Sequence, residues 1–189
     1  MSLNRHEVDG LVEQGRENEV YHLLLSAGRA LEAAGADFAL ICANGVHRFF
    51  DRLKDELSLP LLHIADVTAQ AIRERGFRTV GLLGIQKTME GSFYHERLQM
   101  QGIRAIVPDL EERRIVHKII FEELVRSVFK SESKQVYLGI MKKLMEQGAE
   151  GIILGCTEIP LLVTQGDTSI ALFSTTVIHC EAAVRASLS

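Results

Sequence analysis

A repeated order of helix, glycine and strand is the feature that most constrains the fold of this chain. Four amphipathic stretches of helical length each stop at a glycine, and an apolar run follows within a few residues. These glycines are Gly35, Gly76, Gly102 and Gly148. Glycine commonly ends helices because it adopts the left-handed backbone without a steric penalty. The alternation predicts an α/β fold with a mainly parallel sheet.

The apolar runs have the length of strands and little polar alternation, which is typical of parallel strands covered on both faces. The four clear runs are Phe38–Cys42, Val80–Gly84, Ile103–Val107 and Gly151–Gly155, and the two weaker ones are Leu61–Ile64 and Ala171–Phe173. The expected helices are Glu19–Ala34, Val67–Arg75, Met89–Gln101, Leu110–Phe129 and Lys134–Gln147.

Composition and charge exclude several classes of protein. The 189 residues include 21 basic and 25 acidic ones, a net charge of -4, which gives no reason to expect nucleic acid or an anionic membrane as a partner. The N-terminus lacks the apolar core of a signal peptide, and no run approaches the roughly 18 apolar residues of a membrane span. The seven histidines show no metal-ligand spacing. Three cysteines, an odd number, argue against a disulfide framework and for a reducing cytoplasm.

Two segments of the chain resemble each other, which suggests an internal duplication. Superposing Gly35 on Gly148 places Asp37 on Glu150 and Ala43 on Cys156. The alternative is that any junction of helix, glycine and strand looks similar. If the duplication is real, the first copy lacks a counterpart of the strand Val80–Gly84. We therefore expect one βα unit, on the order of 40 residues, to be missing at the front.

The strongest chemical signal follows the strand Gly151–Gly155. Cys156, Thr157 and Glu158 come directly after it, and ligands of parallel α/β sheets bind at the carboxyl ends of strands. Amide N–H groups of a turn there would favour the thiolate of Cys156, the form that acts as nucleophile or base. From these residues alone, a half-buried structural cysteine is the more common interpretation.

A second polar segment, Cys-Ala-Asn-Gly-Val-His (42–47), also follows a strand. The repeat matches Ala43, not Cys42, to Cys156, so Cys42 should face the opposite side and pack. Asn44 can offer amide donors to a carboxylate, and His47 is most simply a helix-start or supporting residue. Elsewhere, Thr88 could cap the next helix or bind a carboxylate with that helix's amides. Lys134 is ordinarily a solvated helix charge.

An ordered set of motifs resembles the aspartate/glutamate racemase family, within the superfamily that also contains hydantoin racemases. Gly-Cys-Thr-Glu-Ile-Pro-Leu-Leu (155–162) looks like the second catalytic motif of that family, and residues 42–47 resemble the first, usually Cys-Asn-Thr-x-His. Leu-Leu-Gly-x-x-x-Thr-Met-Glu (82–90), Leu-His-Ile-Ala-Asp (62–66), Ile-Ile-Phe-Glu-Glu-Leu (119–124) and His-x-Glu-x-Ala-Val (179–184) also fit. The resemblance covers essentially the whole chain, with residues 2–4 aligning near the family's second strand.

The resemblance implies two pseudo-symmetric α/β lobes with the active site in the cleft between them. Residues 1–76 plus 174–189 would form the N-terminal-type lobe, and residues 77–173 the other. It also implies homodimers and a mechanism without cofactor or metal, in which one cysteine removes the Cα proton of an amino acid and a second returns it to the opposite face.

The resemblance assigns roles residue by residue. Cys156 would be catalytic, while Asn44, Thr88, Thr157 and Lys134 would bind the substrate and Glu158 and His47 would support the site. The sequence departs from the family pattern where Ala43 replaces the first catalytic cysteine and Gly45 replaces the motif's threonine. Alanine has no group for proton transfer.

Three functions therefore stand as expectations. The first is an isomerase of the racemase family that acts on aspartate or glutamate, with activity impaired by Ala43. The second is a non-catalytic relative that binds a small dicarboxylate. The third is a sister activity such as a hydantoin racemase, a maleate isomerase or a single-cysteine decarboxylase.

Overall fold

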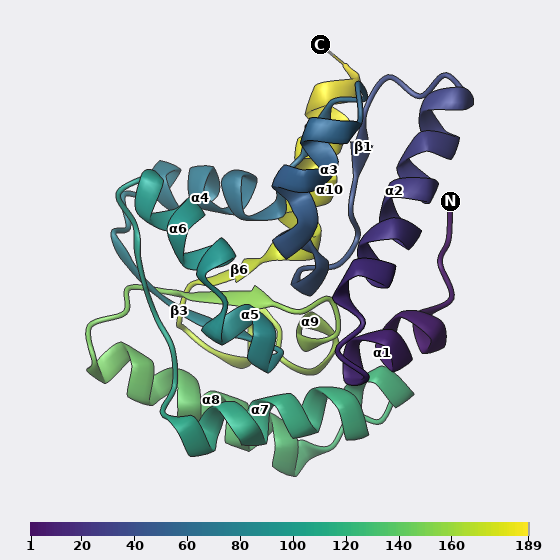
Figure 1. The fold of residues 1–189 in the computed structure, drawn as a ribbon. Helices are drawn as coiled ribbons and strands as arrows, with labels where there is room; N and C mark the ends of the chain where they lie inside the picture. Colours follow the sequence, from purple (N-terminus) through teal and green to yellow (C-terminus); the bar gives the residue numbers. More distant parts are fainter. Residues whose placement is uncertain (189) are drawn as a thin grey trace.

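The computed structural model describes residues 1–188, and they form an α/β fold with two parallel sheets (Figure 1). The strands are β1 (Ala39–Leu40), β2 (Leu61–Leu62), β3 (Thr79–Gly84), β4 (Arg104–Ile106), β5 (Ile152–Gly155) and β6 (Leu172–Ser174). The α-helices are α1 (Arg5–Glu13), α2 (Glu17–Ala33), α3 (Phe50–Glu56), α4 (Ile64–Glu74), α5 (Gln86–Glu90), α6 (Ser92–Met100), α7 (Leu110–Glu122), α8 (Ser131–Glu146), α9 (Ile159–Leu162) and α10 (Thr175–Ser187). Three short 3-10 helices are η1 (Gly45–Phe49), η2 (Leu124–Arg126) and η3 (Gln165–Asp167).

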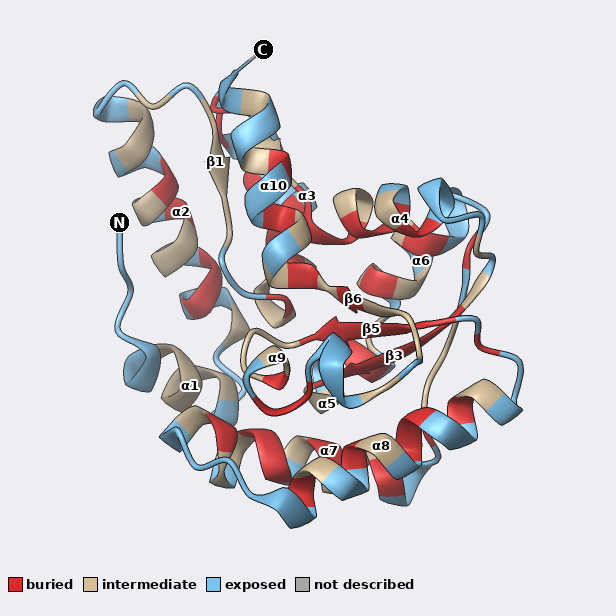
Figure 2. Cartoon of the chain, turned by 180° about the vertical axis from the view of Figure 1, so that it is seen from behind, coloured by how far each residue is buried: buried red, intermediate tan, exposed pale blue. Residues whose placement is uncertain are grey.

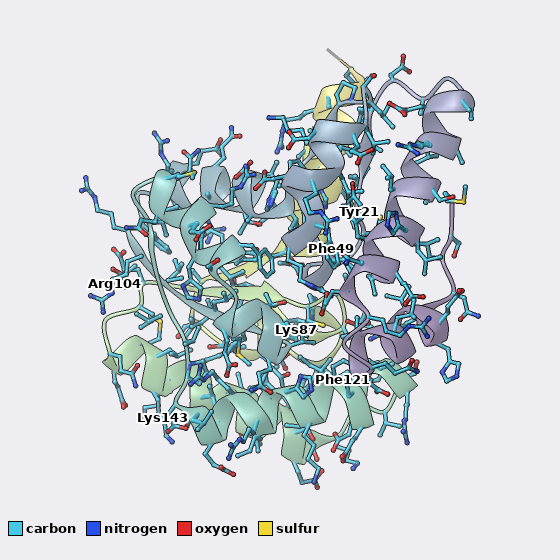
Figure 3. All side chains as sticks on the ribbon, in the orientation of Figure 1. Tyr21, Phe49, Lys87, Arg104, Phe121 and Lys143 are labelled. Atoms are coloured by element: carbon cyan, nitrogen blue, oxygen red, sulfur yellow. The ribbon has the colours of Figure 1, made fainter. Side chains whose placement is uncertain are left out.

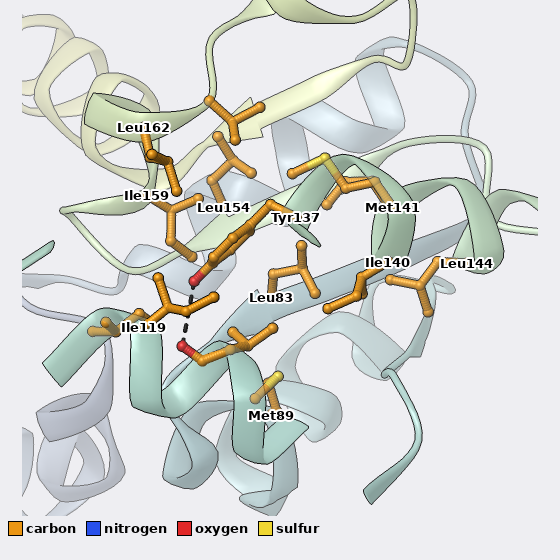
Figure 4. Close-up of a cluster of buried hydrophobic side chains, with 14 of the residues drawn as sticks. Leu83, Met89, Ile119, Tyr137, Ile140, Met141, Leu144, Leu154, Ile159 and Leu162 are labelled. Atoms are coloured by element: carbon orange, nitrogen blue, oxygen red, sulfur yellow. Dashed lines mark hydrogen bonds between the residues drawn. The ribbon is translucent and has the colours of Figure 1, made fainter. Parts of the chain in front are cut away.

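The larger sheet has the order β4-β3-β5-β6, with all neighbours parallel. Its central strands β3 and β5 are almost wholly buried, as Figure 2 shows in red. Helices α4 and α6 pack on one face, and α5, α7, α8 and α9 supply side chains to the core on the other. Figure 4 shows this second core, in which the ring of Tyr137 lies among Leu83, Leu154 and Ile159. Burial on both faces explains the continuous apolar runs of these strands.

The smaller sheet pairs β1 with β2, and α2, η1 and α3 build its core. Helix α10 returns from the far end of the chain and lies against α4 and β2. His179 of α10 contacts the carbonyl oxygen of Leu62 in β2 at 3.1 Å. Helix α10 therefore joins the smaller sheet to the larger one. The proposed lobe boundary at residue 76 stays a prediction, and Ser189, the last residue of that lobe, lies outside the described residues.

The glycine stops and the strand positions are confirmed. Gly35, Gly76, Gly102 and Gly148 all have positive φ, between 73° and 97°, and each predicted run overlaps one strand. The superposition of Gly35 on Gly148 also places Ala39, the start of β1, on Ile152, the start of β5. In both copies the next strand pairs in parallel with the first, and a helix follows.

Several helix boundaries differ from the prediction. The expected helix Met89–Gln101 is two helices, because Gly91 has an extended backbone between α5 and α6. The expected helix Leu110–Phe129 ends as an α-helix at Glu122. Residues 2–4, aligned with a strand, form none: the Asn4 side chain accepts from the amide of His6 and caps α1. Within residues 1–188, no helix combines the length and apolarity that membrane crossing requires.

Candidate functional site

The carboxyl ends of β3, β5 and β6 meet at one edge of the larger sheet, and each is followed by polar side chains. Cys156 follows β5 directly, Thr175 follows β6, and Thr88 lies in α5 just after β3. A Cβ atom on Gly155 would lie 3.4 Å from the Thr88 methyl group and 2.9 Å from the carbonyl oxygen of Leu83. The bare backbone of Gly155 therefore makes room for the carbonyl oxygen of Leu83 in β3 beside the strand end that carries Cys156.

The thiol of Cys156 is part of a four-residue network. Its Sγ donates to Glu158 Oε2 at 2.9 Å, and the Thr157 hydroxyl donates to the same oxygen at 2.7 Å. The other carboxylate oxygen, Oε1, accepts from Arg5 Nη1 of α1 at 2.8 Å. Both oxygens of Glu158 thus accept hydrogen bonds. One accepts from a charged donor, and the other accepts from the thiol and from the hydroxyl.

This network sets the protonation of Cys156. Burial raises the pKa of the thiol, and the neighbouring Glu158 carboxylate raises it further. Burial also pushes the pKa of Glu158 upward, but the donors Cys156, Thr157 and Arg5 together hold it below its ordinary value. The expectation that turn amides would favour the thiolate of Cys156 is therefore wrong. The favourable amide contact is present, but burial and an adjacent negative charge outweigh it.

Asn44 joins the first polar segment to the strand of Cys156. The Thr175 hydroxyl donates to the carbonyl oxygen of Leu154 at 2.9 Å, and Asn44 Nδ2 donates to that hydroxyl at 3.0 Å. Because a carbonyl oxygen only accepts, the hydroxyl proton is committed to Leu154 and the Asn44 amide nitrogen must face Thr175. Asn44 Oδ1 and Thr88 Oγ1 are left buried without a partner among the described residues. Buried polar atoms normally have a hydrogen-bond partner, so these two atoms are exceptions.

The structure keeps Ala43 exposed, and its carbonyl oxygen contacts the buried ring of His47 at 2.8 Å. Gly45 begins η1, where an added Cβ would meet the end of the Ile85 side chain at 2.9 Å and lie 3.8 Å from Thr88 Oγ1. Arg48 donates to the carbonyl oxygen of Gly45 at 2.5 Å. Gly45, the residue after Asn44, therefore lies close to Thr88.

Glu17, the first residue of α2, binds two cations near this segment. Its carboxylate accepts from Arg48 and from Lys87, the residue before Thr88. Figure 3 labels Lys87 on α5. The contact fixes the start of α2 against η1 and α5.

Two further predicted positions differ from expectation. Cys42 is exposed rather than packed, because β1 ends at Leu40 and Cys42 lies beyond the regular pleat on which the prediction relied. Lys134 Nζ binds Asp167 Oδ1 of η3 at 2.8 Å. The described contacts therefore bring Cys156, Thr157 and Glu158 together and place Gly45 near Thr88, while Lys134 binds Asp167.

Three histidines form a buried cluster behind Asn44. The ring centroid of His47 lies 4.8 Å from that of His63 and 5.8 Å from that of His179. Burial lowers the pKa of all three, to about 4 for His47. Within residues 1–188, no group of three metal-ligating side chains is placed to hold an ion.

Sequence reasoning missed Arg5 and Thr175. Thr175 had a usable signal, because Ser-Thr-Thr (174–176) follows a weak strand as polar residues follow the others. Arg5 had none, since it lies 153 positions before Glu158 in a charged N-terminal segment.

Comparison with known proteins gives consistent results. The family model for Asp/Glu/hydantoin racemases matches residues 8–183. The broad-specificity amino-acid racemase RacX of Bacillus subtilis is 22% identical over 170 residues, which are 88% of this chain and 72% of that protein. A solved structure from Yersinia pestis, assigned to the Asp/Glu racemases, is 42% identical with a TM-score of 0.91, covering 100% of this chain and 82% of its own. An aspartate racemase homologue from Pyrococcus horikoshii is 36% identical with a TM-score of 0.86 and the same coverage.

Proposed function

The chain belongs to the Asp/Glu/hydantoin racemase family, and we propose that it transfers the Cα proton of an acidic amino acid with Cys156 as the acid/base group. One observation carries the proposal: the Cys156 thiol lies at a strand end, hydrogen-bonded to the Glu158 carboxylate at 2.9 Å. A carboxylate within hydrogen-bond reach can take the proton of the thiol, and the thiolate that remains is the base that takes the Cα proton. The reaction so proposed uses neither a cofactor nor a metal.

Asn44 and Thr88 are the best-supported substrate contacts. Each has a buried polar atom without a partner in the described part of the chain, so a bound ligand would satisfy them. Thr157 is already bonded to Glu158 and Lys134 to Asp167. To touch the substrate, either would exchange an existing bond for a new one. We therefore give Asn44 and Thr88 the main role in holding a substrate carboxylate or ammonium group.

Ala43 makes the proposed chemistry one-sided. Inversion at Cα needs a group that takes the proton from one face and one that returns it to the other, and an alanine side chain has no transferable proton. We expect Cα–H exchange with retention of configuration to exceed racemisation.

Proton NMR in deuterated buffer tests this. L-aspartate should lose its Cα–H signal in the presence of the wild type, while D-aspartate accumulates far more slowly. Exchange should disappear with Cys156→Ser and persist with Cys180→Ser, which removes an exposed cysteine. Equal exchange by the Cys156→Ser variant would remove Cys156 from the reaction.

A second function, binding of a small dicarboxylate without catalysis, is favoured by Ala43 and by the raised pKa of Cys156. Calorimetry with L-aspartate, L-glutamate and succinate separates the two. Succinate has no α-amino group, so a pure dicarboxylate binder should bind it as tightly as aspartate. A substrate panel containing hydantoins and maleate tests the sister activities. We also propose a homodimer in the cytoplasm, which light scattering and cell fractionation would test.

A further inference from the structure

We propose that Arg5 is a positioning residue for Cys156, because it fixes the Glu158 carboxylate that accepts the thiol hydrogen bond. The inference deepens the proposed function and rests on the role given there to Cys156. Arg5 itself touches neither the thiol nor Thr157 through any described hydrogen bond, so it can position the thiol only through Glu158.

The two oxygens of Glu158 accept hydrogen bonds from different partners. Oε1 receives Arg5 Nη1 at 2.8 Å, whereas Oε2 receives both Cys156 Sγ and the Thr157 hydroxyl. A carboxylate held at one oxygen by a charged donor loses rotational freedom about its last bond, and charge-assisted hydrogen bonds are the stronger kind. Oε2 therefore keeps a fixed place, which fixes the direction of the S–H bond. Positioning of this kind matters because proton transfer depends on alignment.

Arg5 is itself oriented by its own helix. Its Nε donates to Asp9 Oδ2 at 3.1 Å, one turn further along α1. The guanidinium group thus binds Asp9 through one nitrogen and Glu158 through another, which suits its planar arrangement of donors. The Arg5 side chain is 47% exposed, while that of Glu158 is only 16% exposed. A cation at the surface therefore holds a carboxylate that is largely withdrawn from water.

The positive charge also controls where the proton resides. Arg5 helps to hold the pKa of Glu158 below its ordinary value, and its charge lowers the pKa of the Cys156 thiol. Without Arg5, both groups should keep their protons to higher pH. An arginine with a purely structural role at the start of α1 would change the free energy of unfolding when replaced, but its replacement would leave the pKa of the thiol unchanged.

The test is the rate of Cys156 alkylation by iodoacetamide as a function of pH, measured in a Cys42→Ser/Cys180→Ser background so that a single thiol reacts. Arg5→Met should lower the rate about threefold at each pH between about 7 and 9, because a rise of about half a unit in the pKa of the thiol lowers the thiolate fraction about threefold. Arg5→Lys should recover most of the rate. Arg16→Met is the matched control, because Arg16 also forms an exposed ion pair, with Glu19, near the same end of the chain.

The same substitution in a Glu158→Gln background decides whether Arg5 acts through Glu158. The rate loss caused by Arg5→Met should then be less than about twofold. An unchanged rate in Arg5→Met, or an equal loss in both backgrounds, would overturn the inference. Alkylation needs no substrate, so a clear Arg5 effect on alkylation without any Cα exchange would refute only the proposed reaction. If Arg5→Met changed neither the Cα exchange nor the alkylation rate, only the role of Arg5 would be refuted.

Discussion

Acidification should destabilise this protein through His47 well before its carboxylates are protonated. His47 Nε2 accepts the backbone N–H of Ile64 at 3.2 Å, and its Nδ1 lies 2.8 Å from the carbonyl oxygen of Ala43, to which it must donate. Both ring nitrogens are therefore committed in the neutral form. A proton on Nε2 would set two donors against each other at the N-terminus of α4, where the helix dipole already disfavours positive charge.

The size of the effect follows from the pKa. The pKa of His47 is lowered from 6.5 to about 4, mainly by burial and also by the neighbouring His179, while the hydrogen bonds to the backbone oppose the shift. The folded state thus binds the proton less readily than the unfolded chain. The stabilisation is fully present above pH 6.5 and is lost as the pH falls toward 4. Between about pH 7.5 and pH 5, linkage gives a loss of about 2 kcal/mol from His47 alone.

Urea denaturation at about pH 7.5, 6 and 5 would measure this loss. His47→Gln retains one donor and one acceptor but does not titrate, so its free energy of unfolding should fall about 2 kcal/mol less over that range than the wild type's. His6→Gln, at an exposed histidine of α1, is the control and should keep the wild-type dependence. If His47→Gln showed the same slope as the wild type, the burial argument for this histidine would fail.

Three other predictions follow from the fold and site. Gly148 has a φ of 97°, so Gly148→Ala should cost about 1–2 kcal/mol, whereas Gly139→Ala, at an exposed helical position with open space, should stabilise by about 0.5–1 kcal/mol; urea titration compares the two. Tyr137 is fully buried and its hydroxyl makes only a long 3.4 Å hydrogen bond (Figure 4), so Tyr137→Phe should cost under about 1 kcal/mol and Tyr137→Ala about 3–5 kcal/mol by the same assay. Ala43→Cys should raise racemisation of aspartate, measured by chiral chromatography, and should do so only while Cys156 is intact.

The elements whose signals are local were predictable from the sequence. Apolar runs marked the strands because a strand buried on both faces needs apolar side chains on both. Glycines marked the helix ends because glycine adopts the left-handed backbone without a steric penalty. Gly91 was harder, because its effect depends on an extended backbone that breaks one apparent helix into two. Asn4 as the cap of α1 was lost in the alignment of residues 2–4 with a strand.

The candidate site was predictable as far as it lies in continuous motifs. Cys156, Thr157 and Glu158 are neighbours in sequence and remain partners in the structure. Arg5 comes from the opposite end of the chain, and only the packing of α1 brings it to Glu158. The protonation of Cys156 was mispredicted for the same reason. It depends on burial, which a motif does not encode, and on a carboxylate whose orientation depends on that distant arginine.

The hydrogen bonds from Asn44 through Thr175 to the carbonyl oxygen of Leu154 join residues that belong to three separate stretches of the chain. A ligand that shifts Asn44 should therefore also shift Leu154, which lies near the end of β5, two residues before Cys156. Ligand binding at the Asn44 amide would in this way change the position of the Cys156 thiol, so that substrate recognition and thiol reactivity depend on the same hydrogen bonds. A substitution such as Thr175→Val would remove both hydrogen bonds while leaving Asn44 and Cys156 unchanged.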